Sequence, residues 1–121
     1  MKKILLLLLI IYVTAEVKAQ LNTDEAMAVQ YFQSGDYEKA AVLYEKLFNR
    51  TKNASYYDPY FSCLLRLKKF DEAEKLARFL QKNNPDNFNY PVDLGRVFQE
   101  RGEQEKSIAL YNNLIKNLPA N

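Results

Sequence analysis

One motif recurs along this chain, and the distance between its copies constrains the fold more than any other feature. The best-preserved copy runs from Gly35 to Leu47, and weaker copies occupy residues 68–77 and 102–111. A small side chain aligns in all three copies and gives a period of 33 and then 34 residues: Ala40, Ala73 and Ser107. A period near this length is typical of solenoids in which each repeat is a helix, a turn and a second helix. The sequence therefore predicts an all-α solenoid of three antiparallel helix pairs.

The first copy shows how each repeat divides into two helices. Glycine adopts the left-handed conformation at a helix C-terminus without strain, so Gly35 should end a helix that Asn22 or Thr23 caps. Asp36 should cap the next helix at once, over residues 37–49. Two helices joined by so short a linker must pack antiparallel.

The second and third copies depart from this pattern at two places. The turn at Leu67-Lys68-Lys69 has no glycine, so one of these residues must adopt the left-handed conformation under strain, or the turn must differ. Gly95 lies in the middle of an expected helix, where glycine costs about 1 kcal/mol relative to alanine. A close approach between two helix backbones at Gly95 would compensate for this cost. Residues 55–58 have the pattern of a capping box that starts a helix before Pro59.

The first nineteen residues have a different character. A basic start is followed by an apolar run over residues 4–13, and Val17-Lys18-Ala19 offers small residues at the two positions that a signal peptidase reads. These are the features of a secretory signal peptide. A membrane anchor is the alternative, but a spanning helix needs about 20 apolar residues, and Glu16 and Lys18 end this run early. We expect residues 1–19 to be a signal peptide and Gln20 to be the first residue of the mature chain.

Charge and composition limit the classes of function. The chain has 17 basic and 15 acidic side chains, and removing residues 1–19 leaves 14 of each, so the basic excess that favours nucleic-acid binding disappears. The absence of histidine argues against Cys/His zinc sites and against Ser-His or Cys-His nucleophiles. Cys63 is the only cysteine, and with no cationic neighbour in sequence it is expected to be a small buried residue. We expect no catalysis, no metal and no cofactor; an enzyme that uses a carboxylate pair is the remaining alternative.

The three copies resemble the tetratricopeptide repeat. The first copy supplies Ala28, Tyr31, Gly35, Asp36, Tyr37, Ala40, Tyr44 and Leu47; the second supplies Phe61, Leu64, Lys68, Phe70, Ala73, Ala77, Leu80 and Pro85; the third supplies Gly95, Phe98, Gly102, Gln104, Ser107, Tyr111, Leu114 and Pro119. The second copy lacks the turn glycine and has Phe61 where the family has a small residue. The resemblance implies a right-handed α-solenoid over residues 20–121, with repeats at about 22–54, 55–88 and 89–121.

The resemblance also implies a function. Tetratricopeptide domains generally bind an extended or helical segment of another protein in a groove lined by the first helix of each repeat. The groove residues implied here are Glu25, Val29, Phe32, Asp58, Ser62, Leu65, Arg66, Asn89, Val92, Arg96 and Gln99. One subfamily holds a C-terminal carboxylate with lysines, asparagines and an arginine. The corresponding residues here do not match that pattern: Glu25, Val29, Pro59, Asn89 and Asp93.

The sequence therefore predicts a non-catalytic protein-binding module in the periplasm or outer envelope of a bacterium, with no membrane span once the signal peptide is removed. A structural spacer or oligomerisation module of a larger envelope protein is the alternative. The last helix should carry Ile108 and Ile115 beside its main apolar stripe, where a further repeat would dock. Self-association through this surface, or a chain that continues past residue 121, would cover it.

Overall fold

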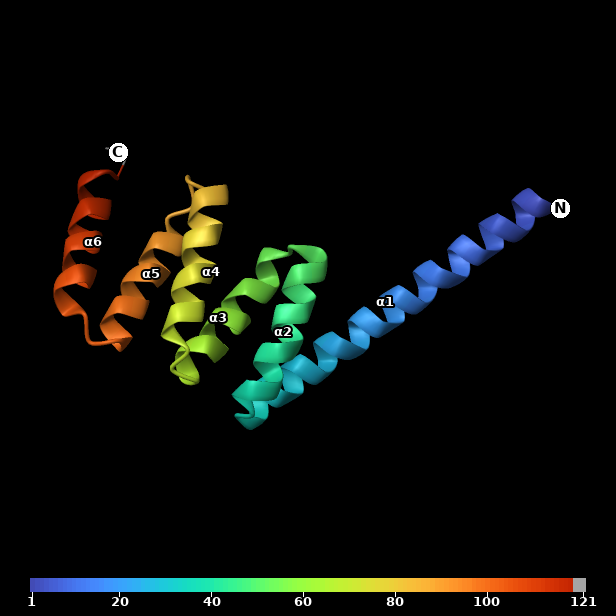
Figure 1. Ribbon diagram of the computed structural model, residues 1–121, viewed down its shortest axis with the longest axis horizontal. Coiled ribbons are helices and arrows are strands. Elements are labelled where there is room, and N and C mark those ends of the chain that lie inside the picture. The colour runs from blue at the N-terminus through green and yellow to red at the C-terminus, as the bar shows by residue number, and fades with distance from the viewer. Residues whose placement is uncertain (119–121) are drawn as a thin grey trace. The chain divides into compact units, whose positions relative to one another are not determined.

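The computed structural model describes residues 1–118 as a series of α-helices without β-strands. The elements are α1 (Lys2–Ser34), α2 (Tyr37–Thr51), a 3-10 turn η1 (Ala54–Tyr56), α3 (Tyr57–Arg66), α4 (Phe70–Asn83), α5 (Asn89–Glu100) and α6 (Gln104–Lys116) (Figure 1). The chain divides into two compact units, one over residues 1–63 and one from Leu64 onward. The predicted all-α class is confirmed.

Within each unit, consecutive helices pack on one another. In the first unit α1 packs along α2, and α2 also contacts η1; in the second unit α5 packs against both α4 and α6. The three small side chains that define the repeat are completely buried: Ala40, Ala73 and Ser107. A buried small residue lets two helix backbones approach closely. Helix packing therefore requires a small side chain at these three positions. The register predicted from sequence is the register of the fold.

The three turns that join the helices of each pair share one geometry. Gly35, Lys68 and Gly102 all have positive φ, of 80°, 57° and 85°. In each turn this residue and its successor donate backbone hydrogen bonds to two carbonyls in the last turn of the helix, as Gly35 does to Phe32 at 3.2 Å and Asp36 does to Tyr31 at 2.9 Å. This pairing is the left-handed C-cap predicted from the glycines. Lys68 adopts it without being glycine, which confirms the strain expected at the second turn.

The N-terminal helix differs from the prediction. The sequence suggested a helix capped at Asn22 or Thr23, but α1 runs without a break from Lys2 to Ser34. Residues 2–34 contain neither glycine nor proline, and the Leu- and Ala-rich composition favours the helix throughout. Thr23 therefore lies inside the helix, where its hydroxyl donates to the carbonyl of Ala19 at 3.0 Å.

The first half of α1 extends past the end of α2 and is unburied (Figure 1). Its most apolar window has a mean hydropathy of 2.0, so the helix is long and apolar enough to cross a membrane by length and composition. A signal sequence near the N-terminus meets the same criterion. The assignment of residues 1–19 as a signal peptide stays a prediction.

Two further helix ends show where local polar residues act. The expected capping box at residues 55–58 is not used; instead Asn53 accepts a hydrogen bond from the Ser55 backbone at 3.0 Å and starts the tight turn η1 ahead of α3. Asn87 accepts from the backbone of Asn89 at 3.0 Å and so begins α5. Pro119, which was expected to end α6, lies outside the described residues.

Candidate protein-binding surfaces

The predicted groove residues lie on the first helix of each pair, and all are exposed or half-buried. The first unit carries Glu25, Val29 and Phe32 on α1 and Asp58 and Ser62 on α3. The second unit carries Leu65 and Arg66 at the end of α3 and Asn89, Val92, Arg96 and Gln99 on α5. Each of these side chains is at least partly accessible to solvent.

Burial alternates in the same way on the three helices. Within each repeat, the residue in the aligned small position is buried and the groove residue that follows it is not: Ala28 and Val29, Phe61 and Ser62, Gly95 and Arg96. Such a switch between adjacent residues is expected when one face of a helix packs on a partner helix and the next face is open. In each repeat, the groove residue of this pair therefore lies on the accessible side of its helix.

Some predicted groove residues also support the fold. The Phe32 ring lies edge-on to the rings of Tyr37 and Tyr44, with centroids 5.6 and 6.2 Å apart, so it anchors α1 on α2. The side-chain oxygen of Gln99 lies 3.4 Å from the Tyr111 hydroxyl and shares that single donor with the Val92 carbonyl, 3.3 Å away. Substitution of Phe32 or Gln99 would therefore report on packing as well as on binding.

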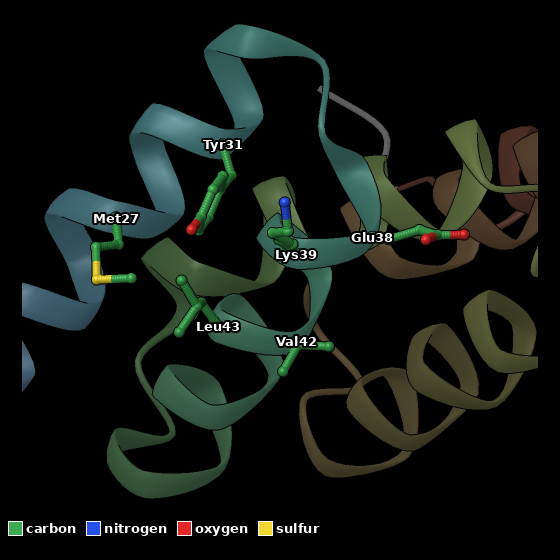
Figure 2. A pocket seen from close by; sticks show the side chains of 6 residues that line it. All are labelled: Met27, Tyr31, Glu38, Lys39, Val42 and Leu43. Atoms are coloured by element: carbon green, nitrogen blue, oxygen red, sulfur yellow. The ribbon is translucent and has the colours of Figure 1, made fainter.

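A second surface lies on the outer side of the first helix pair. Met27 and Tyr31 of α1 and Glu38, Lys39, Val42 and Leu43 of α2 line a hollow of about 330 Å³, here called the α1–α2 hollow. Figure 2 shows Met27 and Tyr31 pointing from α1 toward Leu43 on α2, with Glu38 directed away. Met27 is 39% exposed, while its neighbour Ala28 is fully buried.

One edge of the α1–α2 hollow is held in place by a charged cluster. The ammonium group of Lys39 lies 2.7 Å from a carboxylate oxygen of Asp36 and 5.2 Å from the centre of the Tyr31 ring. The hydrogen bond to Lys39 lowers the pKa of Asp36, and the same pair raises the pKa of Lys39. Both groups are therefore charged at neutral pH, and the apolar part of the hollow lies beside them.

A third surface lies on α6. Ile108 is 57% exposed and Ile115 is 65% exposed, as the sequence predicted, and the two are here called the α6 stripe. Tyr111 is half-buried and contacts α5. Exposed apolar residues that recur on one helix face mark a candidate interaction site.

Most of the charged clusters are structural ion pairs. In the first unit, the carboxylate of Asp24 is 97% buried and lies 2.8 Å from Lys46 and 3.5 Å from Arg50, and it accepts from Gln20 at 2.9 Å. The hydrogen bond from Lys46 is the largest cause of the lowered pKa of Asp24.

In the second unit, Arg101 contacts three carboxylates: Glu74 at 2.8 Å, Asp71 at 2.9 Å and Glu103 at 3.2 Å. The pKa values of Glu74 and Glu103 are lowered by their cationic partners, although burial opposes the shift at Glu74. A general acid needs a raised carboxyl pKa. The carboxylates with resolved shifts in the described part of the chain, Asp24, Asp36, Glu74 and Glu103, are all shifted downward.

Cys63 is fully buried, and burial raises its pKa to about 11. A thiol with so high a pKa is almost wholly protonated at neutral pH and is a poor nucleophile. Its environment is that of a small core residue, as predicted from sequence.

A comparison with known families finds one match. Residues 92–121, which contain most of α5 and all of α6, match the tetratricopeptide repeat. No curated protein matches the chain. The matched segment is the third copy of the motif, and the turn and small residue of that copy recur with the same geometry in the first two. Repeats of this kind generally mediate protein–protein interactions. The match supports a tetratricopeptide repeat in the third copy, and the succession of packed helices agrees with it.

Proposed function

We propose that this protein is an exported, non-catalytic module of the cell envelope that binds an extended or helical segment of another protein on the open faces of α1, α3 and α5. The observation that carries the proposal is the repeated switch from a buried to an accessible residue at the same place in all three first helices. Accessible side chains that recur at the same place in each repeat offer contacts to a linear partner.

The accessible side chains favour a mixed peptide. Val29 and Leu65 offer apolar contacts, and Arg66 and Arg96 offer guanidinium groups that suit carboxylates. A segment that carries both apolar and acidic side chains fits this composition best. The export part of the proposal rests on the N-terminal segment, whose basic start, apolar run and Val17-Lys18-Ala19 junction are those of a signal peptide.

Affinity capture tests the binding proposal. The protein produced in its own host, immobilised and exposed to envelope extract, is expected to retain a partner, and Val29→Glu combined with Arg66→Glu should abolish retention. Val42→Glu is the matched control, because Val42 is 65% exposed on α2 and outside the groove face. Equal retention by the groove variant and the parent would refute the proposal.

The alternative is a structural or oligomerisation module. It is favoured by the α6 stripe, because two exposed isoleucines on one helix offer an apolar contact surface. The capture experiment separates the two functions, since a spacer would not lose a partner when the groove face is changed.

A further inference from the structure

The repeat register shows that the α1–α2 hollow exposes positions that are buried elsewhere in the chain. Met27 and Tyr31 are exposed or half-buried on α1. Their equivalents in the second repeat, Tyr60 and Leu64, and in the third repeat, Leu94 and Phe98, are at most 8% exposed. All six positions carry apolar or aromatic side chains. The difference in exposure therefore comes from what packs over each side chain and not from the type of side chain.

The contacts of Phe98 show what covers this position in the third repeat. The guanidinium carbon of Arg78, on the preceding helix α4, lies 6.0 Å from the ring centre, and the ammonium of Lys106 lies 5.8 Å from it. Tyr31 has the equivalent of Lys106, because Lys39 lies 5.2 Å from its ring centre. Among the described residues, no second cation lies against the Tyr31 ring in the place that Arg78 takes at Phe98, and Tyr31 lines the hollow. The Tyr31 ring therefore has one of the two cationic neighbours that the Phe98 ring has.

The α6 stripe is the complementary case. Ile108 and Ile115 occupy the register positions of Ala41 and Phe48 on α2, which are 6% and 4% exposed. Within the first unit, η1, which starts the next repeat, packs on α2. The α6 stripe is thus a surface of the kind that a following repeat covers, and it is apolar.

We propose that the α6 stripe of one molecule docks in the α1–α2 hollow of a second copy, which repeats between molecules the junction that joins consecutive repeats within the chain. Both surfaces continue an interface already formed inside the molecule, and both are apolar. By the register, Asn112 of one copy would lie over Tyr31 of the next, as Arg78 lies over Phe98.

The two docking surfaces differ, so the contact is heterologous. An assembly of any length therefore has an unoccupied hollow at one end and an unoccupied α6 stripe at the other. Such a contact extends to chains of molecules as concentration rises. The inference deepens the self-association described above as the alternative function, and it does not depend on the peptide groove.

Mixing two variants tests the arrangement. Ile108→Glu with Ile115→Glu blocks the α6 stripe, and Met27→Glu with Val42→Glu blocks the hollow; all four side chains are at least 39% exposed, so the fold should tolerate the changes. Each variant alone, in the protein as its host produces it, should be monomeric by sedimentation at concentrations where the parent associates, with affinity reduced about tenfold or more by the buried charges. An equimolar mixture should form a one-to-one dimer, because each variant retains the surface that the other lacks.

The other outcomes overturn the proposal. Association of the hollow variant with itself, and no one-to-one dimer of the two variants in the mixture, would mean that α6 pairs with α6 symmetrically. A parent that stays monomeric at all concentrations would mean that these surfaces meet no second copy. Val29→Glu is the matched control, since it lies on the groove face of the same helix α1; it should leave association unchanged even where it abolishes peptide capture. Loss of association in Val29→Glu would contradict the docking proposal. Unchanged peptide capture in the same variant would contradict the groove proposal.

Discussion

The backbone of α5 at Gly95 lies directly against the ring of Tyr111 on α6. A β-carbon built at Gly95 would lie 2.6 Å from the Tyr111 hydroxyl oxygen and closer still to two ring carbons. The same hydroxyl donates to the carbonyl of Val92 at 3.3 Å, so the ring is fixed where it is. The close helix approach predicted from a mid-helix glycine is therefore confirmed, and Tyr111 is the side chain that fills the space.

This contact predicts the effect of a single methyl group. Gly95→Ala should destabilise the protein by about 1–3 kcal/mol through overpacking, although alanine is favoured over glycine in a helix by about 1 kcal/mol. Urea unfolding gives the free-energy difference. Combining the change with Tyr111→Ala should remove most of the clash, so the two substitutions should be strongly non-additive. An additive pair would mean that Tyr111 does not occupy this space.

The second turn holds removable strain. Lys68 has a φ of 57°, a conformation that costs a side chain with a β-carbon roughly 1–2 kcal/mol. Lys68→Gly should therefore raise the free energy of unfolding by about 0.5–1 kcal/mol, after allowing for the greater entropy of glycine in the unfolded chain. Lys75→Gly, inside α4, is the control and should lower it by about 1 kcal/mol. Equal losses from both variants would show that Lys68 is unstrained.

Ser107 offers a substitution that removes a polar group. Its hydroxyl is fully buried and has no hydrogen-bond partner among the described residues, whereas the equivalent residues Ala40 and Ala73 carry no such group. Ser107→Ala should stabilise the protein by about 1 kcal/mol, because an unpaired buried hydroxyl loses its bonds to water on folding. Ala40→Ser should have the opposite sign. Thermal unfolding of both variants decides the matter, and a loss of stability in Ser107→Ala would reveal a hidden partner for the hydroxyl.

The buried carboxylate of Asp24 makes stability depend on acid. Its pKa in the folded protein lies below the ordinary value of 3.8, chiefly because Lys46 donates to it. The folded state therefore gains stability from the charged form above about pH 4 and loses it as the pH falls through the lowered pKa.

Asp24→Asn should accordingly cost about 1–3 kcal/mol at pH 7, since it leaves Lys46 and Arg50 without their carboxylate. The difference from the parent should shrink toward pH 2. Denaturant unfolding across this pH range is the measurement, with Asp86→Asn on an exposed loop as the control. A difference that does not change with pH would assign the effect to packing.

Processing of the N-terminus gives the last prediction. Protein recovered from its own host should begin at Gln20, because Val17-Lys18-Ala19 presents the small residues that signal peptidase requires. Intact mass and N-terminal peptide analysis measure this directly. Ala19→Arg is expected to block processing and leave the precursor. Recovery of the parent with Met1 in place would favour a membrane anchor.

The repeat register and the three turns were predictable from the sequence because their causes are local. Gly35 and Gly102 stand where the chain needs a positive φ, and Ala40, Ala73 and Ser107 stand where two helices cross. A steric requirement of this kind restricts the residue type at one position, so the type reveals the requirement. The match at residues 92–121 agrees with the register obtained in this way.

Tertiary structure decided which apolar residues are covered and which charges are buried. Met27 and Leu94 have equivalent positions and similar chemistry, yet one is 39% exposed and the other 3%, because α4 packs beside α5 and the corresponding side of α1 opens into the hollow. Asp24 is buried because α1 packs on α2, which brings Lys46 and Arg50 within 2.8 and 3.5 Å of its carboxylate. Burial depends on the element that packs against a residue and on the charges it brings, and helical periodicity records only the face on which that residue lies.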